Sequence, residues 1–341
     1  SALTGDGVGE LRDCLGQLTS ERRAAARRIG ADLDAAADLP DGAGLPAAVV
    51  PELVELLVAA GAVGVLDGAG RLPEEADPVA AQREFHDVLA HWHSRRGFSG
   101  LPIGATFPFR ERYAPPAAVK PVTGPVIALP EPDPDLLQEQ DPPLAAVMEG
   151  RRSVRRYGTG SLTLGQLGEF LHRTVRVRRE VPANDAVPYD WTRRPVPSAG
   201  GGHDLELYLA VTRCRGLAPG IYHYEPVPHG LTLVTADRSA VLDQVRNAAT
   251  CMGERSVPQV VVILAARFNR LSWKYRGLAY TAGLKNVGVL YEAMYLAATA
   301  MRLGGCGLGN GDSAAFAELT GLDPLEESSV GEFALGIPAE E

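Results

Sequence analysis

The chain has 341 residues, of which 45% are hydrophobic and 22% charged, a balance typical of globular proteins. Its net charge of −9 argues against a general nucleic-acid-binding protein, which needs a basic surface. No apolar stretch is long enough to span a membrane, and the first residues do not resemble a signal peptide. The length suggests about two domains. The scattered cysteines suggest reduced thiols in a cytoplasmic protein: Cys14, Cys214, Cys251 and Cys306.

Residues 1–100 are expected to form a small helical domain with the outline of a winged helix. Residues 11–37 are rich in alanine, leucine and arginine, which predicts one or two helices. A further helix is expected after Pro46, and the segment Asp67-Gly68-Ala69-Gly70 between two apolar runs indicates a hairpin. Asp77 and Pro78 then provide the start of a helix that would reach about Arg96.

Nine prolines between residues 115 and 143 predict an extended linker over residues 101–145. From residue 146 to 341 the pattern is mixed, which predicts an α+β domain. Its expected elements are a helix over 162–175 capped by Thr163, a strand over 205–211 with one buried face, a hairpin of 221–224 and 231–234, a central strand at 260–264, a buried or interfacial helix over 284–303 and a last strand at 333–337.

The segment RRSVRR, residues 151–156, places four guanidinium groups and one hydroxyl within six residues. Arginine makes paired hydrogen bonds to phosphate oxygens, so this segment is a candidate phosphate site. A solvent-exposed run of charge explains the same residues equally well.

Two glycine-rich segments are candidates for close backbone approach to a flat ligand. One is PSAGGGH, residues 197–203, and an ordinary flexible loop is its simpler explanation. The other is GGCGLGNG, residues 304–311, expected as a loop that ends the preceding helix. The second segment lacks the glycine spacing of a dinucleotide fingerprint, and it follows a helix rather than a strand.

Lys274 and Tyr275 form the best candidate for acid–base chemistry. The chain has only three lysines, although arginine is common, so a lysine is of interest where a removable proton is needed. A positive charge beside a phenol favours the phenolate, which can accept a proton. A surface lysine beside a half-buried tyrosine is the ordinary alternative. Histidine and cysteine spacings predict no metal site.

Taken in order, these segments resemble the nitroreductase superfamily of flavin enzymes and, within it, the SagB-type dehydrogenases. The resemblance covers about residues 151–338, with FHDVLAHWHSRRG upstream as an approach segment. Its motifs are RRSVRRYG with LTLGQLGEFL, PSAGGGHDLELYLAV with PGIYHYEPVPHGL, WKYRGLAY, MYLAATAMRLGGCGLGNGD and SSVGEFALG.

The resemblance implies an α+β flavin fold, with a central mixed or antiparallel sheet flanked by helices. It also implies an interlocked homodimer with FMN at the interface. The residues implied to bind FMN are Arg151, Arg152, Ser153 and Arg155 at the phosphate and ribityl chain, Pro197, Ser198, Ala199 and Gly200 at the ring, and Asn286, Gly305, Cys306, Gly307, Leu308 and Gly309 nearby.

The implied reaction is oxidation of thiazoline or oxazoline rings in a ribosomally made precursor peptide to thiazoles or oxazoles. Tyr275 would accept the proton with the help of Lys274, or Lys274 would act as the base, and O₂ would reoxidise the flavin. A cyclodehydratase is the implied partner. The amino-terminal domain would bind a leader peptide or simply pack against the flavin domain.

Three other functions remain open. Residues 284–288 read LKNVG where many relatives have Ala-Gly-His, a departure that also resembles oxidases embedded in nonribosomal peptide synthetases, which act on carrier-bound rings. The second alternative is an NAD(P)H-dependent nitro or quinone reductase, which needs no dedicated base. The third is a non-catalytic peptide-binding scaffold, which would hold no flavin.

Overall fold

The structure is a computed structural model that describes residues 67–71, 77–96, 100–102, 104–185, 187–254 and 256–340. The chain divides into two compact units, residues 1–100 and 101–341. The helices expected within 1–66, and with them most of the winged-helix outline, lie outside the described residues. Residues 67–71 form a turn in which the Gly70 N–H donates to the Asp67 carbonyl at 2.9 Å.

The helix expected from Asp77 to Arg96 is interrupted. The Asp77 carboxylate accepts hydrogen bonds from the N–H groups of Val79 and Ala80, as an N-cap does. The turn that follows is a short 3₁₀ helix, η1 (Ala80–Gln82), and α5 (Phe85–His93) begins separately. Arg83 and Glu84 between them are extended, which breaks the hydrogen-bond ladder of a single helix.

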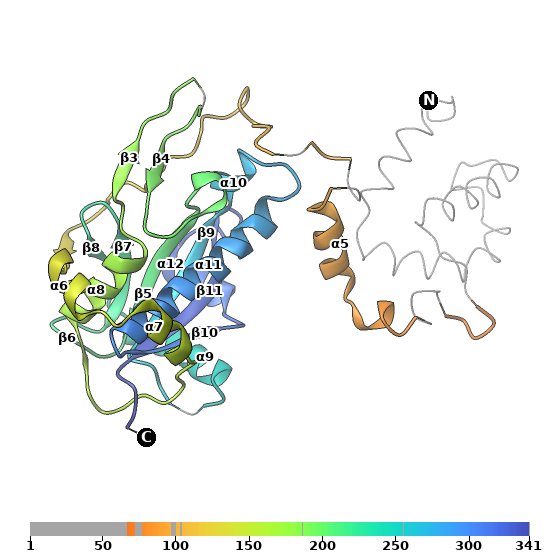
Figure 1. Cartoon of the computed structure of the whole chain (residues 1–341). Coiled ribbons are helices and arrows are strands. Elements are labelled where there is room, and N and C mark those ends of the chain that lie inside the picture. The colour runs from red at the N-terminus through yellow and green to blue at the C-terminus, as the bar shows by residue number, and fades with distance from the viewer. Residues whose placement is uncertain are drawn as a thin grey trace, which may run out of the picture. The chain divides into compact units, whose positions relative to one another are not determined.

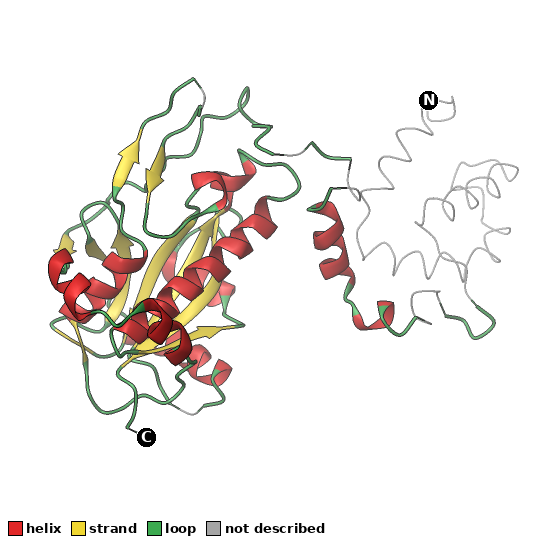
Figure 2. Ribbon diagram, viewed as in Figure 1, coloured by secondary structure: helices red, strands yellow, loops and turns green. Residues whose placement is uncertain are grey.

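The second unit is built on a seven-stranded sheet (Figures 1 and 2), and every neighbouring pair in it is antiparallel. The strands, in spatial order, are β1 (Val126–Ala128), β8 (Gly230–Thr235), β7 (Gly220–Glu225), β5 (Leu205–Val211), β9 (Val260–Arg267), β11 (Glu327–Gly336) and β10 (Gly304–Leu308). Two small sheets pair β2 (Leu162–Thr163) with β6 (Cys214–Arg215) and β3 (Arg179–Val181) with β4 (Trp191–Arg193).

Helices cover both faces of the large sheet (Figure 2). One core contains residues of α8 (Leu164–Thr174) and α11 (Ala279–Ala300), with Phe170 stacked on Phe333. The other contains residues of α9 (Arg238–Cys251) and α12 (Ser313–Thr320). The α+β flavin-fold architecture expected from the sequence is therefore confirmed in its sheet and helix layers.

Several individual elements match expectation. Thr163 caps α8 in a capping box with Gln166, β7 and β8 form a hairpin, and β9 is a central strand. Two expectations are wrong. Strand β5 is buried on both faces rather than one, because helices cover both sides of the sheet. Residues 304–308 are strand β10, paired with β11, rather than a loop after the helix.

The remaining elements of the second unit are α6 (Pro134–Gln140), α7 (Leu144–Gly150), η2 (Ala199–Gly201) and α10 (Phe268–Ser272). Residues 101–145, the expected linker, contribute β1, all of α6 and the start of α7 to this unit. The three described cysteines are free thiols: Cys214, Cys251 and Cys306. Among the described helices, none combines the length and apolarity that a bilayer crossing requires.

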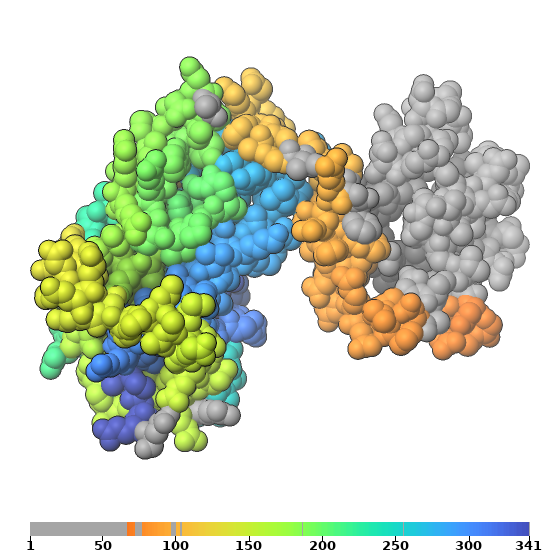
Figure 3. All heavy atoms as spheres, viewed as in Figure 1, coloured from red at the N-terminus to blue at the C-terminus, as the bar shows by residue number. Residues whose placement is uncertain are grey.

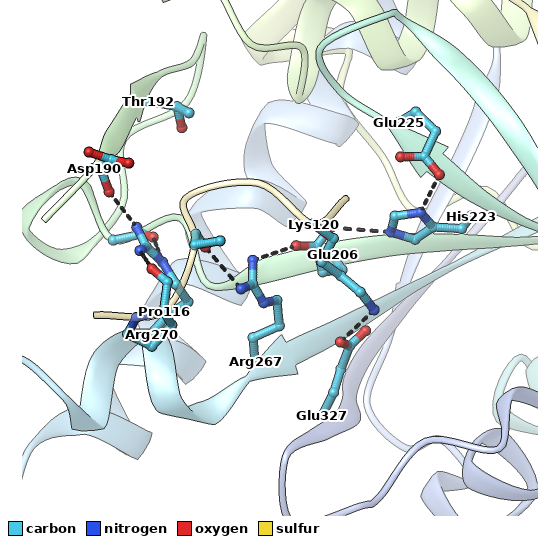
Figure 4. A network of polar contacts seen from close by, with 12 residues as sticks. Pro116, Lys120, Asp190, Thr192, Glu206, His223, Glu225, Arg267, Arg270 and Glu327 are labelled. Carbon is cyan, nitrogen blue, oxygen red and sulfur yellow. Dashed lines mark hydrogen bonds and ion pairs between the residues drawn. The ribbon is translucent and has the colours of Figure 1, made fainter. Parts of the chain in front are cut away.

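Two arginines fix the proline-rich segment 113–120 to the end of β9 and to α10 (Figure 4). Arg267 pairs with Glu206 at 3.1 Å and donates to the Ala117 carbonyl at 2.9 Å. Arg270 donates to the Pro116 carbonyl at 2.6 Å and to the Gly202 carbonyl at 3.0 Å. The segment is therefore held by charge-assisted bonds beside the residues that follow α10.

The same network contains a buried histidine between two carboxylates (Figure 4). His223 contacts Glu225 at 2.9 Å and Glu206 at 3.2 Å. Burial alone would lower the pKa of His223, but the two glutamates outweigh burial and raise that pKa to about 9. The imidazolium is thus the form that this network stabilises.

Candidate active site

Lys274 lies immediately after α10 and is nearly buried, with 7% of its surface exposed. Its Nζ donates a hydrogen bond to the Gly200 carbonyl at 2.7 Å and another to the Tyr189 hydroxyl. The Tyr189 hydroxyl donates to the same carbonyl at 3.1 Å. A buried ammonium needs such acceptors, so the side chain of Lys274 is fixed in one position.

Gly200 brings the first glycine-rich segment against the Lys274-Tyr275 pair. Its φ of +54° lies in the left-handed region, which glycine adopts without strain. A Cβ atom at this position would overlap both the Tyr275 hydroxyl and the Lys274 amine. The structure therefore places two of the sequence-predicted groups in direct contact, and only glycine fits between them.

Asn286 on α11 links this loop to Asp204 through two hydrogen bonds. Its Oδ1 accepts from the Ala199 N–H at 2.9 Å, and its Nδ2 donates to Asp204 at 2.6 Å. The Ser198 hydroxyl accepts from the His203 N–H at 3.0 Å. Burial raises the pKa of Asp204. Both ends of the Asn286 amide are used within the protein, so its role here is to position the loop.

Three aromatic rings surround Lys274, and the sequence did not single out two of them, Phe107 and Tyr189. Phe107, Tyr189 and Trp273 have ring centroids 5.5 to 6.2 Å apart. The Phe107 N–H donates to the Lys274 carbonyl at 3.2 Å, which ties this ring to the site. Because Phe107 precedes Lys274 by more than 160 residues, no local pattern indicates their contact.

The arginine-rich segment lies in a second cluster, centred on Tyr295 of α11. The Tyr295 hydroxyl bonds to the Ser153 hydroxyl at 2.8 Å and accepts from the Gly307 N–H at 2.8 Å. The Arg151 guanidinium lies 5.1 Å from the Tyr295 ring centroid. The Val154 N–H donates to the Gly305 carbonyl at 2.9 Å. Tyr295 thus joins the predicted phosphate segment to β10.

The donors of this second cluster suit an anion. Within the described part of the chain, neither Arg151 nor Arg155 has a carboxylate partner. Arg152 and Arg155 are exposed. Arg151 and Arg155, which have no carboxylate partner among the described residues, can give N–H pairs to a phosphate.

The glycines of β10 mainly serve packing. A Cβ on Gly305 would lie 2.7 Å from the Phe333 ring, and one on Gly307 would lie 3.1 Å from Tyr291. The side chains of Cys306 and Leu308 are buried in the core. Gly309, beyond the strand, is exposed and has open space around its Cα. Only backbone groups of this segment are free to approach a ligand.

The two clusters lie on opposite sides of α11. Asn286 and Tyr295 are nine residues apart, which is about two and a half helical turns and a rise of about 14 Å. Accordingly, Asn286 contacts the Gly200 loop on one side of the helix, and Tyr295 contacts β10 on the other. A flat group at the Gly200 loop and a phosphate at Arg151 therefore meet different faces of the same helix.

Comparison with known proteins places a family match within the second unit. The model of the nitroreductase family matches residues 148–337. A protein of Methanocaldococcus jannaschii whose name assigns it to the nitroreductases is 30% identical over 168 residues, which are 49% of this chain and 78% of that protein.

Solved structures with a related fold include a protein of Ralstonia eutropha assigned to the nitroreductases. It has 23% identity and a TM-score of 0.49, and the match covers 71% of this chain and 100% of that one. The Escherichia coli microcin synthetase McbBCD complex, solved with truncated pro-MccB17 bound, has 17% identity and a TM-score of 0.46. That match covers 77% of this chain and 95% of the other.

Proposed function

Since this chain belongs to the nitroreductase family, we propose that it is an FMN-dependent dehydrogenase that oxidises thiazoline or oxazoline rings in a ribosomally made peptide. The products would be thiazoles or oxazoles. The observation that carries this proposal is the contact of Lys274 and Tyr275 with the Gly200 loop. A dedicated proton acceptor beside a ring-binding loop is what an azoline oxidation requires.

Proteins of this family bind FMN, and the described residues fit that cofactor. Arg151, Arg155 and Ser153 supply donors for its phosphate. Pro197, Ser198 and Gly200 would border its ring, where glycine permits close approach. FMN, when bound, would accept the two electrons that leave the substrate ring.

The two clusters on opposite sides of α11 support a homodimer, the usual state of nitroreductase-fold proteins. A second chain that brings its own Gly200 loop to the Arg151 cluster of the first would complete each site. α11 also exposes apolar side chains, Tyr280, Leu284 and Val289, which a partner chain would cover.

The residues of this chain would move one proton, the one that leaves the Cα of the azoline ring. Oxidation of the azoline removes a proton from Cα and a hydride from Cβ, which leaves the aromatic ring. The Tyr275 oxygen would accept the proton. Lys274, held by Gly200 and Tyr189, places a positive charge near that oxygen, with its Nζ 5.2 Å from the Tyr275 ring centroid. Phe107 and Trp273 would keep water away from this position.

The buried position of Lys274 favours this function over a simple NAD(P)H-dependent reductase. A reductase receives hydride from the nicotinamide and takes protons from solvent, so it needs no buried cation beside a tyrosine. The peptide substrate would come from a cyclodehydratase, which forms the azoline ring. An oxidase acting on carrier-bound rings would use the same residues and differ in how its substrate arrives.

The test is oxidation of a synthetic peptide that carries one thiazoline, with the purified protein, FMN and air. Mass spectrometry should show the loss of two hydrogen atoms per ring. The Tyr275→Phe variant is the matched control, because it keeps the ring and lacks the proton acceptor. A flavin-loaded protein that leaves the thiazoline unchanged would refute the proposal.

A further inference from the structure

An arginine-lined groove adjoins the Gly200 loop at Gly201. It lies between the β3–β4 hairpin, which stands out from the second unit (Figure 3), and residues 197–203. Its cavity volume is about 580 Å³. The side chains that matter for recognition are Arg178, Arg179, Trp191, Arg193 and Arg194.

Two buried donors in this groove have no acceptor. The Arg194 Nη2 and the Trp191 Nε1 are both buried and make no hydrogen bond. Burial lowers the pKa of Arg194 by more than the nearby carboxylates of Glu206 and Asp204 raise it. Buried donors in folded proteins nearly always have partners, and an unmade bond costs about 1–3 kcal/mol. A ligand with acceptor oxygens would satisfy both groups.

The hairpin itself carries like charges opposite one another. Arg179 is the direct register partner of Arg193, and both side chains are exposed. Like charges in that position destabilise a hairpin. Within the described residues neither arginine has a carboxylate partner. The hairpin also carries Glu180, Asp185 and Asp190, but the lining of the groove contains four arginines and no carboxylate.

We propose that this groove binds an acidic segment of the peptide substrate, with carboxylates paired to Arg179, Arg193 and Arg194. The inference rests on the proposed function and adds a recognition site to it. Trp191 joins the two regions, because its ring lies 3.5 Å from where a Cβ of Gly201 would be, next to Gly200. A peptide whose azoline ring lies at Lys274 can therefore continue into the groove.

The spacing of the donors favours a peptide over a phosphate group. Trp191 and Arg193 lie on β4, where the rise is about 3.3 Å per residue, and Arg194 follows the strand directly. Arg179 faces Arg193 from β3, and Arg178 precedes that strand. Donors spread along a hairpin match carboxylates spaced along an extended chain. The segment suited to a phosphate, residues 151–155, lies in the separate Tyr295 cluster.

Fluorescence anisotropy with the FMN-loaded full-length protein tests this inference without any turnover. The probe is a labelled synthetic peptide in which glutamate alternates with glycine, with no azoline ring. Its affinity should exceed that of the matching glutamine peptide by at least about tenfold and should fall with added salt. The double variant Arg179→Gln/Arg193→Gln should lose that difference, whereas Arg179→Lys/Arg193→Lys should retain most of it.

The matched control is Arg215→Gln/Arg238→Gln, which removes the same charge at exposed positions outside the groove and should bind the acidic peptide normally. Equal loss in the control, or equal binding of the glutamine peptide, would overturn the inference. The inference would also be overturned if the protein bound inorganic pyrophosphate through Arg179 and Arg193 and did not bind the acidic peptide. Thiazoline oxidation that persists without acidic-peptide binding would overturn only the groove and leave the proposed function intact.

Discussion

The Lys274 Nζ donates a hydrogen bond to the carbonyl of Gly200 at 2.7 Å, although the two residues are separated by 74 positions in the chain. This bond joins the end of α10 to the loop that precedes β5. It fixes a positive charge where the proposed ring-binding loop turns. The proposed chemistry depends on this contact more than on any other.

Replacing Gly200 by alanine should displace the tips of Lys274 and Tyr275, because the added Cβ overlaps both. We expect thiazoline oxidation, measured per bound FMN, to fall by about 10²-fold. Gly165→Ala on α8 is the matched control, since a Cβ there makes only an ordinary contact with Thr163. Equal losses in both variants would contradict a specific role for Gly200.

Tyr275→Phe and Lys274→Ala should each retain FMN and lose at least about 10²-fold in oxidation rate, the usual contribution of a positioned acid–base group. Single-turnover kinetics with a thiazoline peptide measures this loss apart from product release. Arg276→Gln, at the exposed neighbouring position, should oxidise normally. Near-full activity of the first two variants would exclude this pair as the acid–base group.

Arg151→Gln with Arg155→Gln should weaken FMN binding by at least about tenfold, because charged hydrogen bonds to phosphate are among the strongest in proteins. Flavin fluorescence during titration of the apoprotein measures the dissociation constant. Arg238→Gln, an exposed arginine on α9, is the control. An unchanged dissociation constant would remove residues 151–155 from the proposed phosphate site.

Protein stability should decrease as the pH rises from 7 to 9.5. The pKa of His223 is about 9 in the folded chain against 6.5 ordinarily, so its contribution is complete below pH 6.5 and is lost as the pH passes 9. Burial raises the pKa of Glu332 from 4.5 to about 7, so that residue titrates at the lower edge of this window and changes stability mainly between pH 4.5 and 7. Thermal unfolding at each pH provides the measurement. Glu225→Gln should move the decrease in melting temperature to lower pH. A melting temperature that stays constant from pH 7 to 9.5 would show that protonated His223 does not stabilise the fold.

Strong local patterns predicted their elements well. Thr163 followed by Gln166 specifies a capping box, and the continuous apolar run at 260–264 specifies a buried strand. Glycine content misled the prediction at 304–308, because small residues there serve close packing against Phe333 and Tyr291 rather than a turn. Burial of both faces of β5 depends on helices elsewhere in the chain, which alternation along one strand does not reveal.

The sequence predicted the individual residues of the candidate site but not the contacts between them. Lys274, Tyr275 and Gly200 stand out as residue types, but their contact arises from the packing of α10 against the loop before β5. Tyr189 and Tyr295 lack a local signal, since an ordinary tyrosine gains its role only from long-range hydrogen bonds.

Anaerobic mixing of the FMN-loaded protein with a thiazoline peptide tests the central claim most directly. If the chain is an azoline dehydrogenase, the visible absorption of the oxidised flavin should disappear as the thiazole forms, and NADPH should have little effect. Bleaching by NADPH, with no change on addition of the thiazoline peptide, would contradict the account and identify a nicotinamide-dependent reductase instead.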